Sequence, residues 1–253
     1  MNSGEFERAT AMIEQTLAAD GRFAEGRQVE LANWLVMGAN WRLIGRLLPS
    51  HTNSLFTGGW LNSLVHGRLA DAEGGMLPWL SYSAIDFIEG VVRADWRVFE
   101  WGSGTSTAWW GSRVEHIHAI EHERQYYDQV AAFGLANLTL RLCEASEDYV
   151  GAIDSAAGGP FDAIIIDGEA PTHLKSGGIL IFDDSDRAAH RDSLVHLRGG
   201  GLKRIEFFGL GPSFLYRKCT SVYLSDDAIL TPATLPSEKR SCLGPTISRA
   251  MGE

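Results

Sequence analysis

The strongest chemical signal in the sequence is a short apolar run that ends in an acid and turns through two glycines. Residues 98–107 read VFEWGSGTST, and a helix-compatible segment follows the second glycine. Glycine lets a backbone turn tightly and lets a ligand approach it closely. The free amides at the start of the following helix favour a carboxylate or a phosphate group. Glu100 would lie beside the same pocket, where its carboxylate could meet a cationic ammonium group.

Two ligand classes compete for this turn. A dinucleotide fingerprint needs a third small residue at position 107, where Thr107 stands, and an acid two residues before the first glycine is not one of its usual features. The zwitterionic methionyl end of S-adenosylmethionine fits better, because it offers an ammonium group to Glu100. A third interpretation, in which the glycines only make a turn, stays open.

Acids or polar residues also follow the next two strand-like runs. Glu121 ends the run 116–121, and an acid roughly 20 positions beyond such a turn binds ribose hydroxyls in the doubly wound fold. Capping of the next helix, together with Glu123, is the alternative. The third run is followed by residues 144–146, which could lie beside an adenine ring or could be ordinary loop residues.

Two further apolar runs end in carboxylates. The run FDAIIID ends at Asp167, and LKSGGILIFDD ends at Asp183 and Asp184. The carboxyl ends of parallel strands form the rim at which open α/β sheets bind ligands, so we expect these acids at the site. Three hard oxygen ligands would suit Mg²⁺ or Ca²⁺, and such a metal would lower the pKa of a hydroxyl group. Asp183 and Asp184 could instead cap the following helix.

The elements that must position these residues alternate between strands and helices from residue 97 onward. This alternation predicts a mostly parallel sheet with helices on both faces. The last two strands are joined by a Gly- and Pro-containing loop that is too short for a crossover helix, so they should pair as an antiparallel hairpin. The predicted strands are 97–101, 116–121, 138–143, 161–167, 178–182, 203–208 and 220–224, and the predicted helices are 105–111, 123–133 and 187–197.

One connection departs from this pattern. Residues 168–178 separate the fourth strand from the fifth, whereas a parallel crossover usually needs a dozen residues or more and generally a helix. Either the helix is almost absent or residues are missing from the sequence at this point. We expect a disordered loop beside the site.

Together these segments resemble the class I S-adenosylmethionine-dependent methyltransferases. The resemblance covers roughly residues 97–224 and rests on EWGSGTS, AIEHE, FDAIIIDG, LKSGGILIFDD and the closing hairpin. The stretches 59–87 and 207–212 also resemble a bacterial group of these enzymes to which we assign no substrate. The resemblance implies an α/β, Rossmann-like, seven-stranded sheet with S-adenosylmethionine across the switch point.

The resemblance also implies roles for single residues. Glu100 and the glycine turn would hold the methionyl part, Glu121 the ribose, and residues 144–146 the adenine surroundings. Asp167, Asp183 and Asp184 resemble in placement the metal-binding acids of catechol-type O-methyltransferases, and Asp167 and Asp184 are the predicted catalytic residues. The predicted cofactor-binding set is Glu100, Gly102, Ser103, Gly104, Thr105, Ser106, Glu121, His122, Glu144, Ala145, Ser146 and Asp167.

The chain divides by texture into three parts. Residues 1–95 are rich in Trp and Leu at helical spacing, with helices expected near residues 6–17, 34–48 and 82–92. Trp79 and Tyr82 could form an aromatic lid over the substrate or could pack in the core. The predicted methyltransferase domain spans 96–230, and a Pro-containing tail spans 231–253.

Composition limits the partners. The net charge is −10 and no Lys/Arg cluster stands out, so we expect no nucleic-acid partner. The three cysteines have neither disulfide-scaffold nor zinc spacing, and the apolar N-terminal stretch is interrupted by polar residues. We therefore expect a cytoplasmic protein without a membrane partner, and a homo-oligomer is left open.

These observations favour methyl transfer from S-adenosylmethionine, most plausibly to an oxygen of a small-molecule or glycan-like acceptor. An NAD-dependent oxidoreductase is the second hypothesis, although Thr107 and the position of Glu100 disfavour it. A non-catalytic module with a methyltransferase-like fold, used for binding, is the third.

Overall fold

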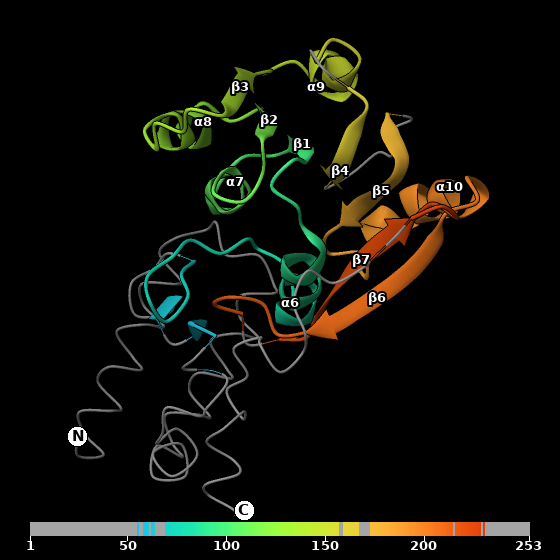
Figure 1. The fold of residues 1–253 in the computed structure, drawn as a ribbon, viewed down its shortest axis with the longest axis horizontal. Coiled ribbons are helices and arrows are strands. Elements are labelled where there is room, and N and C mark those ends of the chain that lie inside the picture. The colour runs from blue at the N-terminus through green and yellow to red at the C-terminus, as the bar shows by residue number, and fades with distance from the viewer. Residues whose placement is uncertain are drawn as a thin grey trace, which may run out of the picture.

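The computed structural model describes residues 55, 58–60, 62–63, 69–156, 159–166, 173–214, 216–228 and 230. Its centre is a seven-stranded sheet in the order β3-β2-β1-β4-β5-β7-β6, shown in Figure 1. Neighbouring strands from β3 to β5 are parallel, and β7 is antiparallel to both β5 and β6. The predicted mostly parallel, Rossmann-like sheet with a closing hairpin is therefore confirmed.

The helices and strands of the described residues follow the predicted alternation. In chain order they are α6 (Tyr82–Val91), β1 (Arg97–Trp101), α7 (Thr105–Gly111), β2 (His116–Glu121), α8 (Arg124–Ala131), β3 (Leu138–Leu142), α9 (Ser146–Val150), the 3₁₀ turn η1 (Gly151–Ile153), β4 (Phe161–Ile166), β5 (Leu174–Phe182), the 3₁₀ turn η2 (Ala188–His190), α10 (Arg191–Gly199), β6 (Lys203–Gly209) and β7 (Lys218–Leu224).

Each face of the sheet is covered by a different set of helices. On one face, α6 and α7 pack with alternate residues of β1, β2, β4, β5 and β7, such as Val98, Ile181 and Val222. On the other face, η1 and α10 pack with the intervening residues, such as Phe99 and Phe182. Successive side chains of a strand point to opposite faces, so this division fixes which strand residues share a face.

The structure differs from the predicted boundaries mainly at β5 and in the short helices. We expected this strand to begin at Gly178, but it begins at Leu174, which pairs with Phe161 across a register shift. Gly177 adopts φ +78° at this irregularity, a conformation that suits glycine. The helix α9 was not predicted, because five residues carry too little periodicity to be recognised. The 168–172 part of the unusual connection lies outside the described residues.

The described part of the N-terminal region belongs to the same core as the sheet. Leu77, Leu80, Ala84, Ile85 and Ile88 are buried together with strand residues of the first face. The helices expected near 6–17 and 34–48, and the tail 231–253, lie outside the described residues. Among the residues that the structure describes, no helix is long and apolar enough to cross a membrane.

Candidate active site

Strand alternation brings three charged side chains to one face of the sheet at one edge. Glu100 precedes the last residue of β1, Asp183 follows the last residue of β5, and Lys218 opens β7. Because β7 runs antiparallel to β5, its first residue lies at the edge where the parallel strands end. Glu100 shares the face of Val98, Asp183 that of Ile181, and Lys218 that of Val222.

These residues line one cavity of about 650 Å³. It lies beyond the carboxyl ends of β1 and β4, where the strand order reverses, and this is the usual ligand position in open α/β sheets. Two loops also contribute to the lining: one precedes α6 and one joins β6 to β7. The full lining is Pro78, Trp79, Leu80, Glu100, Trp101, Gly102, Ser103, Gly104, Thr105, Ser106, Trp110, Ile165, Ile166, Asp183, Asp184, Arg187, Ser213, Phe214, Tyr216 and Lys218.

The glycine turn forms one end of the cavity. Gly102 adopts φ +79°, which favours glycine over any side chain. Gly104 is different, because its φ of 175° is an extended conformation that any residue adopts. A Cβ atom added at Gly104 would have no heavy atom within 4 Å. Gly104 therefore leaves open space beside the cavity rather than relieving backbone strain.

Glu100 is buried beneath this turn. Thr107 Oγ donates to Glu100 Oε2 at 2.6 Å, and the Gly104 amide donates to Thr107 Oγ at 3.0 Å. Burial raises the pKa of Glu100 to about 7, and the nearby Glu121 adds a smaller increase, although hydrogen bonds from Ser106 and Thr107 oppose this. Burial thus disfavours the ionised form of this carboxyl group, and a bound cationic ligand would stabilise that form.

Glu121 supports the turn from behind. Its Oε2 accepts hydrogen bonds from the Ser103 amide at 2.7 Å and from Ser103 Oγ at 3.0 Å. Its Oε1 accepts from the amides of His122 and Glu123 at 2.8 and 2.9 Å. Glu121 is only 2% exposed and is not part of the cavity lining. The structure thus joins Glu121 to the turn; its predicted contact with a ribose stays a prediction.

The residues expected around an adenine lie outside the cavity lining. Glu144 and Ala145 are exposed, and nothing is described of the Ser146 side chain. The exposed His122 ring lies 5.3 Å from the Tyr149 ring, centroid to centroid. The Tyr149 hydroxyl is 4.0 Å from where a Cβ of Gly102 would lie. The adenine roles of these residues stay predictions.

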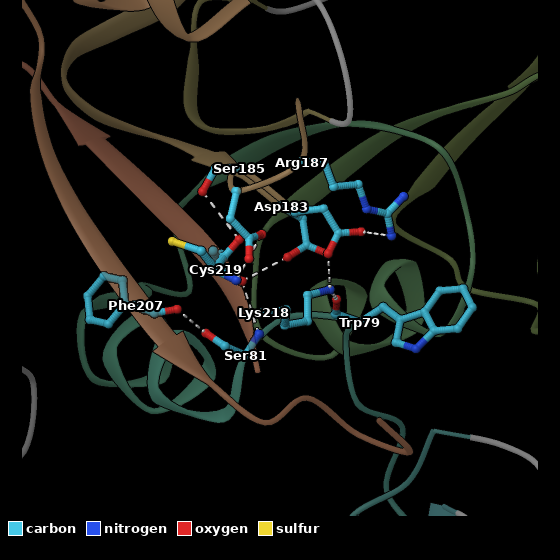
Figure 2. Close-up of polar contacts among 11 residues, drawn as sticks. Trp79, Ser81, Asp183, Ser185, Arg187, Phe207, Lys218 and Cys219 are labelled. Carbon is cyan, nitrogen blue, oxygen red and sulfur yellow. Dashed lines mark hydrogen bonds and ion pairs between the residues drawn. The ribbon is translucent and has the colours of Figure 1, made fainter. Parts of the chain in front are cut away.

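A buried ionic cluster forms the opposite end of the cavity, and Figure 2 shows how its members face one another. Lys218 Nζ lies 2.6 Å from Asp183 Oδ2 and 3.0 Å from Asp184 Oδ1, and it donates to the Trp79 carbonyl at 2.8 Å. Asp183 Oδ1 accepts from Thr220 Oγ at 2.8 Å. Asp184 Oδ2 is ion-paired with Arg187. The cluster therefore combines two carboxylates with two cations.

Burial and mutual charge shift the pKa values of this cluster. Burial raises the pKa of Asp183 to about 6, and Asp184 adds to the increase, whereas Lys218 opposes it. Burial by itself would lower the pKa of Lys218, but its contacts with Asp183 and Asp184 outweigh this and raise it. Lys218 therefore stays protonated, and Asp183 can exchange a proton near pH 6.

Aromatic side chains form the wall next to this cluster. The rings of Trp79 and Phe214 are stacked at 5.5 Å between centroids, and Phe214 also contacts Tyr216 at 5.0 Å. Trp79 is 51% exposed, so it presents aromatic surface at the cavity. Of the two residues for which a lid was considered, Trp79 lines the cavity, whereas Tyr82 packs against the core and is not in the lining.

The sheet order, the antiparallel β7 and a cavity at the β1–β4 switch point together decide the fold. It is a class I methyltransferase fold. No protein-family model and no curated protein matches this sequence.

Similar solved structures carry methyltransferase names at low sequence identity. Precorrin-6y C5,15-methyltransferase from Geobacter metallireducens has a TM-score of 0.43 and 16% identity, over 56% of this chain and 87% of that one. Fibrillarin from Aeropyrum pernix, with bound S-adenosyl-L-methionine, has a TM-score of 0.43 and 14% identity, over 56% of this chain and 75% of that one. The tRNA (m1A58) methyltransferase TrmI from Aquifex aeolicus has a TM-score of 0.44 and 13% identity, over 65% of this chain and 75% of that one.

The methyltransferase fold raises two ligand questions that the residues can answer. The glycine-turn end fits a zwitterionic amino-acid group, because it offers a buried carboxylate, free space at Gly104 and a helix start at Thr105. The acidic end does not fit a divalent cation. All four carboxylate oxygens of Asp183 and Asp184 already bind protein donors, and Lys218 lies between them. Among the described residues no group of three or more metal-ligating side chains occurs, and Asp167 lies outside them.

Sequence reasoning missed Lys218. The sequence predicts that the last strand begins at Thr220, which places Lys218 in the preceding loop, but β7 begins at Lys218. Residues 218–224 read KCTSVYL, without an alternation of polar and apolar residues, so no local pattern marks Lys218 as part of the strand. The signal was topological: an antiparallel last strand must start at the edge where the parallel strands end.

Proposed function

We propose that this protein is an S-adenosylmethionine-dependent methyltransferase that modifies an oxygen of a small-molecule or glycan-like acceptor. One observation carries the proposal. A single cavity at the switch point joins a glycine turn with a buried carboxylate to a proton-accepting acidic cluster. Methyl transfer requires both ends, since a donor and an acceptor must be aligned within one water-poor space.

The glycine-turn end supports the donor half. Glu100 would bind the ammonium group of the cofactor, because the carboxylate is buried and has no cationic partner among its described hydrogen bonds. The amides of Thr105 and Ser106 would face the cofactor carboxylate, because the Gly104 amide already donates to Thr107 Oγ. Glu121 fixes the Ser103 backbone, so that the turn keeps one shape before the cofactor arrives. We propose that Gly102 and Ser103 also hold the methionyl part, and that residues 144–146 lie beside the adenine. His122 and Asp167 complete the proposed cofactor-binding set.

The acidic end supports the acceptor half. S-Adenosylmethionine, when bound, supplies an electrophilic methyl group on a sulfonium. The chain then has to orient an acceptor hydroxyl and remove its proton. Asp183 and Asp184 line the cavity and can accept hydrogen bonds from hydroxyl groups, and Asp183 has a pKa suited to proton exchange near pH 6. The aromatic wall at Trp79 and Phe214 suits the apolar face of a ring.

The charge of the acceptor end favours an uncharged acceptor. The two carboxylates of the cluster are matched by Lys218 and Arg187, so the cluster is close to neutral. Both cations are committed to carboxylates and are not free to bind phosphate. A neutral hydroxylated ring therefore fits better than a phosphate ester or a polyanion.

Binding of the cofactor tests the proposal directly. We expect S-adenosylmethionine and S-adenosylhomocysteine to raise the Tm of the protein in a thermal-shift measurement, whereas NAD and NADH leave it unchanged. A ligand at 100 times its Kd stabilises a protein by about 2.7 kcal/mol. Calorimetry with S-adenosylhomocysteine then gives the Kd.

The outcomes separate the three hypotheses. Stabilisation by NAD or NADH alone would establish the dinucleotide alternative, and no response to either sulfur compound would contradict the proposal. If the cofactor binds but no hydroxylated acceptor in a broad panel yields S-adenosylhomocysteine, the non-catalytic module gains support.

A further inference from the structure

The second of the two acids at the end of β5 is held in an unusual backbone conformation. Asp184 has φ +48°, one of two positive values among non-glycine residues of the described chain. This conformation costs a residue with a side chain free energy, so it persists only where surrounding contacts hold it. Here those contacts are the ion pairs of Asp184 with Lys218 and Arg187.

Lys218 is fully engaged by this pair and by one carbonyl. Its side chain is 2% exposed, and an ammonium group has three N–H donors. The structure gives it three acceptors: Asp183 Oδ2, Asp184 Oδ1 and the Trp79 carbonyl oxygen. No donor is left for a ligand, so the role of the lysine is directed at the two acids.

A divalent cation and the Lys218 ammonium would compete for one place. A metal that bridged Asp183 and Asp184 would need oxygen ligands at roughly 2.0–2.6 Å on the side where the carboxylates face each other. The ammonium nitrogen lies at 2.6 and 3.0 Å from one oxygen of each carboxylate. Two cations cannot share that space, because their charges repel strongly at such short distance.

We propose that Lys218 is the built-in cation of the acceptor half of this site, and that its ammonium holds Asp183 and Asp184 in the place of a divalent metal ion. Lys218 is thus a positioning residue rather than a catalytic one. The acceptor half itself rests on the proposed function. It follows that a hydroxylated acceptor contacts the carboxylates directly, instead of as a metal chelate.

The first arm of the test uses Mn²⁺ alone, because its electron paramagnetic resonance signal reports bound metal. Chelator-stripped wild-type protein is titrated with Mn²⁺, and calorimetry with Mg²⁺ and Ca²⁺ repeats the measurement. We expect no stoichiometric binding. Stoichiometric binding that disappears in Asp183→Asn would overturn the proposal, and this arm needs no Lys218 variant to fold.

The second arm removes the cation. Lys218→Met keeps most of the side-chain volume but leaves two buried carboxylates facing each other, so it should bind Mn²⁺ at least tenfold more tightly than the wild type. Lys218→Arg restores a cation and should not bind Mn²⁺. Lys175→Met is the matched control, since Lys175 pairs with Asp162 at 2.7 Å and is 53% exposed. A folded Lys218→Met protein without increased Mn²⁺ binding would also overturn the proposal.

Binding of S-adenosylhomocysteine distinguishes this inference from the proposed function. If the wild type binds S-adenosylhomocysteine and the Mn²⁺ titrations give the expected results, the proposed function and the built-in cation are both supported. If the nucleoside fails to bind while Lys218→Met gains Mn²⁺, the built-in cation stands and the methyltransferase function falls.

Discussion

Gly104 is the residue at which cofactor binding can be separated from folding. A Cβ atom there meets nothing within 4 Å, and the backbone is extended, so a side chain is tolerated by the fold but projects into open space. We expect Gly104→Val to keep the wild-type Tm and to lose detectable binding of S-adenosylhomocysteine in calorimetry. Gly199→Val is the control, because Gly199 also has open space and lies at the end of α10, outside the cavity lining. Retained micromolar binding in Gly104→Val would contradict the assigned role of the turn.

Glu100 predicts how stability depends on pH. Its pKa is raised from 4.5 to about 7, so the folded protein holds this proton more tightly than the unfolded chain. Stability from Glu100 is therefore fully present below pH 4.5 and is lost as the pH rises through 7. Glu100→Gln, which stays neutral, should be more stable than the wild type at pH 8 by on the order of 3 kcal/mol.

Chemical denaturation at pH 5 and pH 8 measures this difference, and the two proteins should converge at the lower pH. The same Glu100→Gln variant should bind S-adenosylhomocysteine more weakly at pH 8, because the ammonium group loses its ionised partner. A Glu100→Gln protein with no gain in stability at pH 8 would show that ionisation of Glu100 does not destabilise the folded protein.

At the scale of elements, the end of β2 positions the turn between β1 and α7. Glu121 accepts the amides of Ser103, His122 and Glu123 with its two oxygens. Glu121→Ala leaves these amides without their partner, which should lower the free energy of unfolding by about 1–3 kcal/mol. It should also weaken S-adenosylhomocysteine binding at least tenfold, equal to about 1.4 kcal/mol, since the turn loses its fixed shape.

Glu123→Ala is the control for this change. The Glu123 side chain is 55% exposed and is not part of the cavity lining, so both stability and binding should stay near wild type. Equal binding by the Glu121→Ala and Glu123→Ala proteins would show that the turn does not depend on β2.

At the scale of the whole molecule, α6 and the segment before it share the core of the sheet. Leu77, Leu80, Ala84, Ile85 and Ile88 are buried against strand residues of one face. A fragment that begins at residue 96, the predicted domain boundary, exposes this apolar face at a cost of about 25 cal/mol per Å². We expect it to lack a cooperative thermal transition in circular dichroism. A fragment of residues 69–253 keeps α6 and should retain one.

The charge of the whole chain bears on its partners. The net charge is −10, and the two cations in the described cavity lining, Lys218 and Arg187, are bound to carboxylates, so this lining offers no free cation for phosphate. We expect a fluorescent RNA oligonucleotide to show no binding at physiological salt in an anisotropy titration. Binding that weakens steeply with salt would contradict this and would point to phosphate contacts elsewhere on the chain.

Local sequence patterns predicted much of the order and bounds of the strands and helices. The bounds predicted for β1, β2 and α7 agree with the structure, and the closing hairpin is confirmed. These elements have strong periodicity and clear turn residues at both ends. The start of β5 was wrong, because LKSGG has neither strand alternation nor β-branched residues, and only pairing with β4 makes it a strand.

The sequence by itself determined the order of strands and helices, the glycine turn and the acids at the strand ends, because these depend on neighbours within a few residues. Only the tertiary structure decided what those acids contact. Lys218 lies 35 positions from Asp183 and 139 from Trp79 in the chain, and an antiparallel strand brings it between them. No local pattern encodes such a pairing, since it depends on which strands lie side by side.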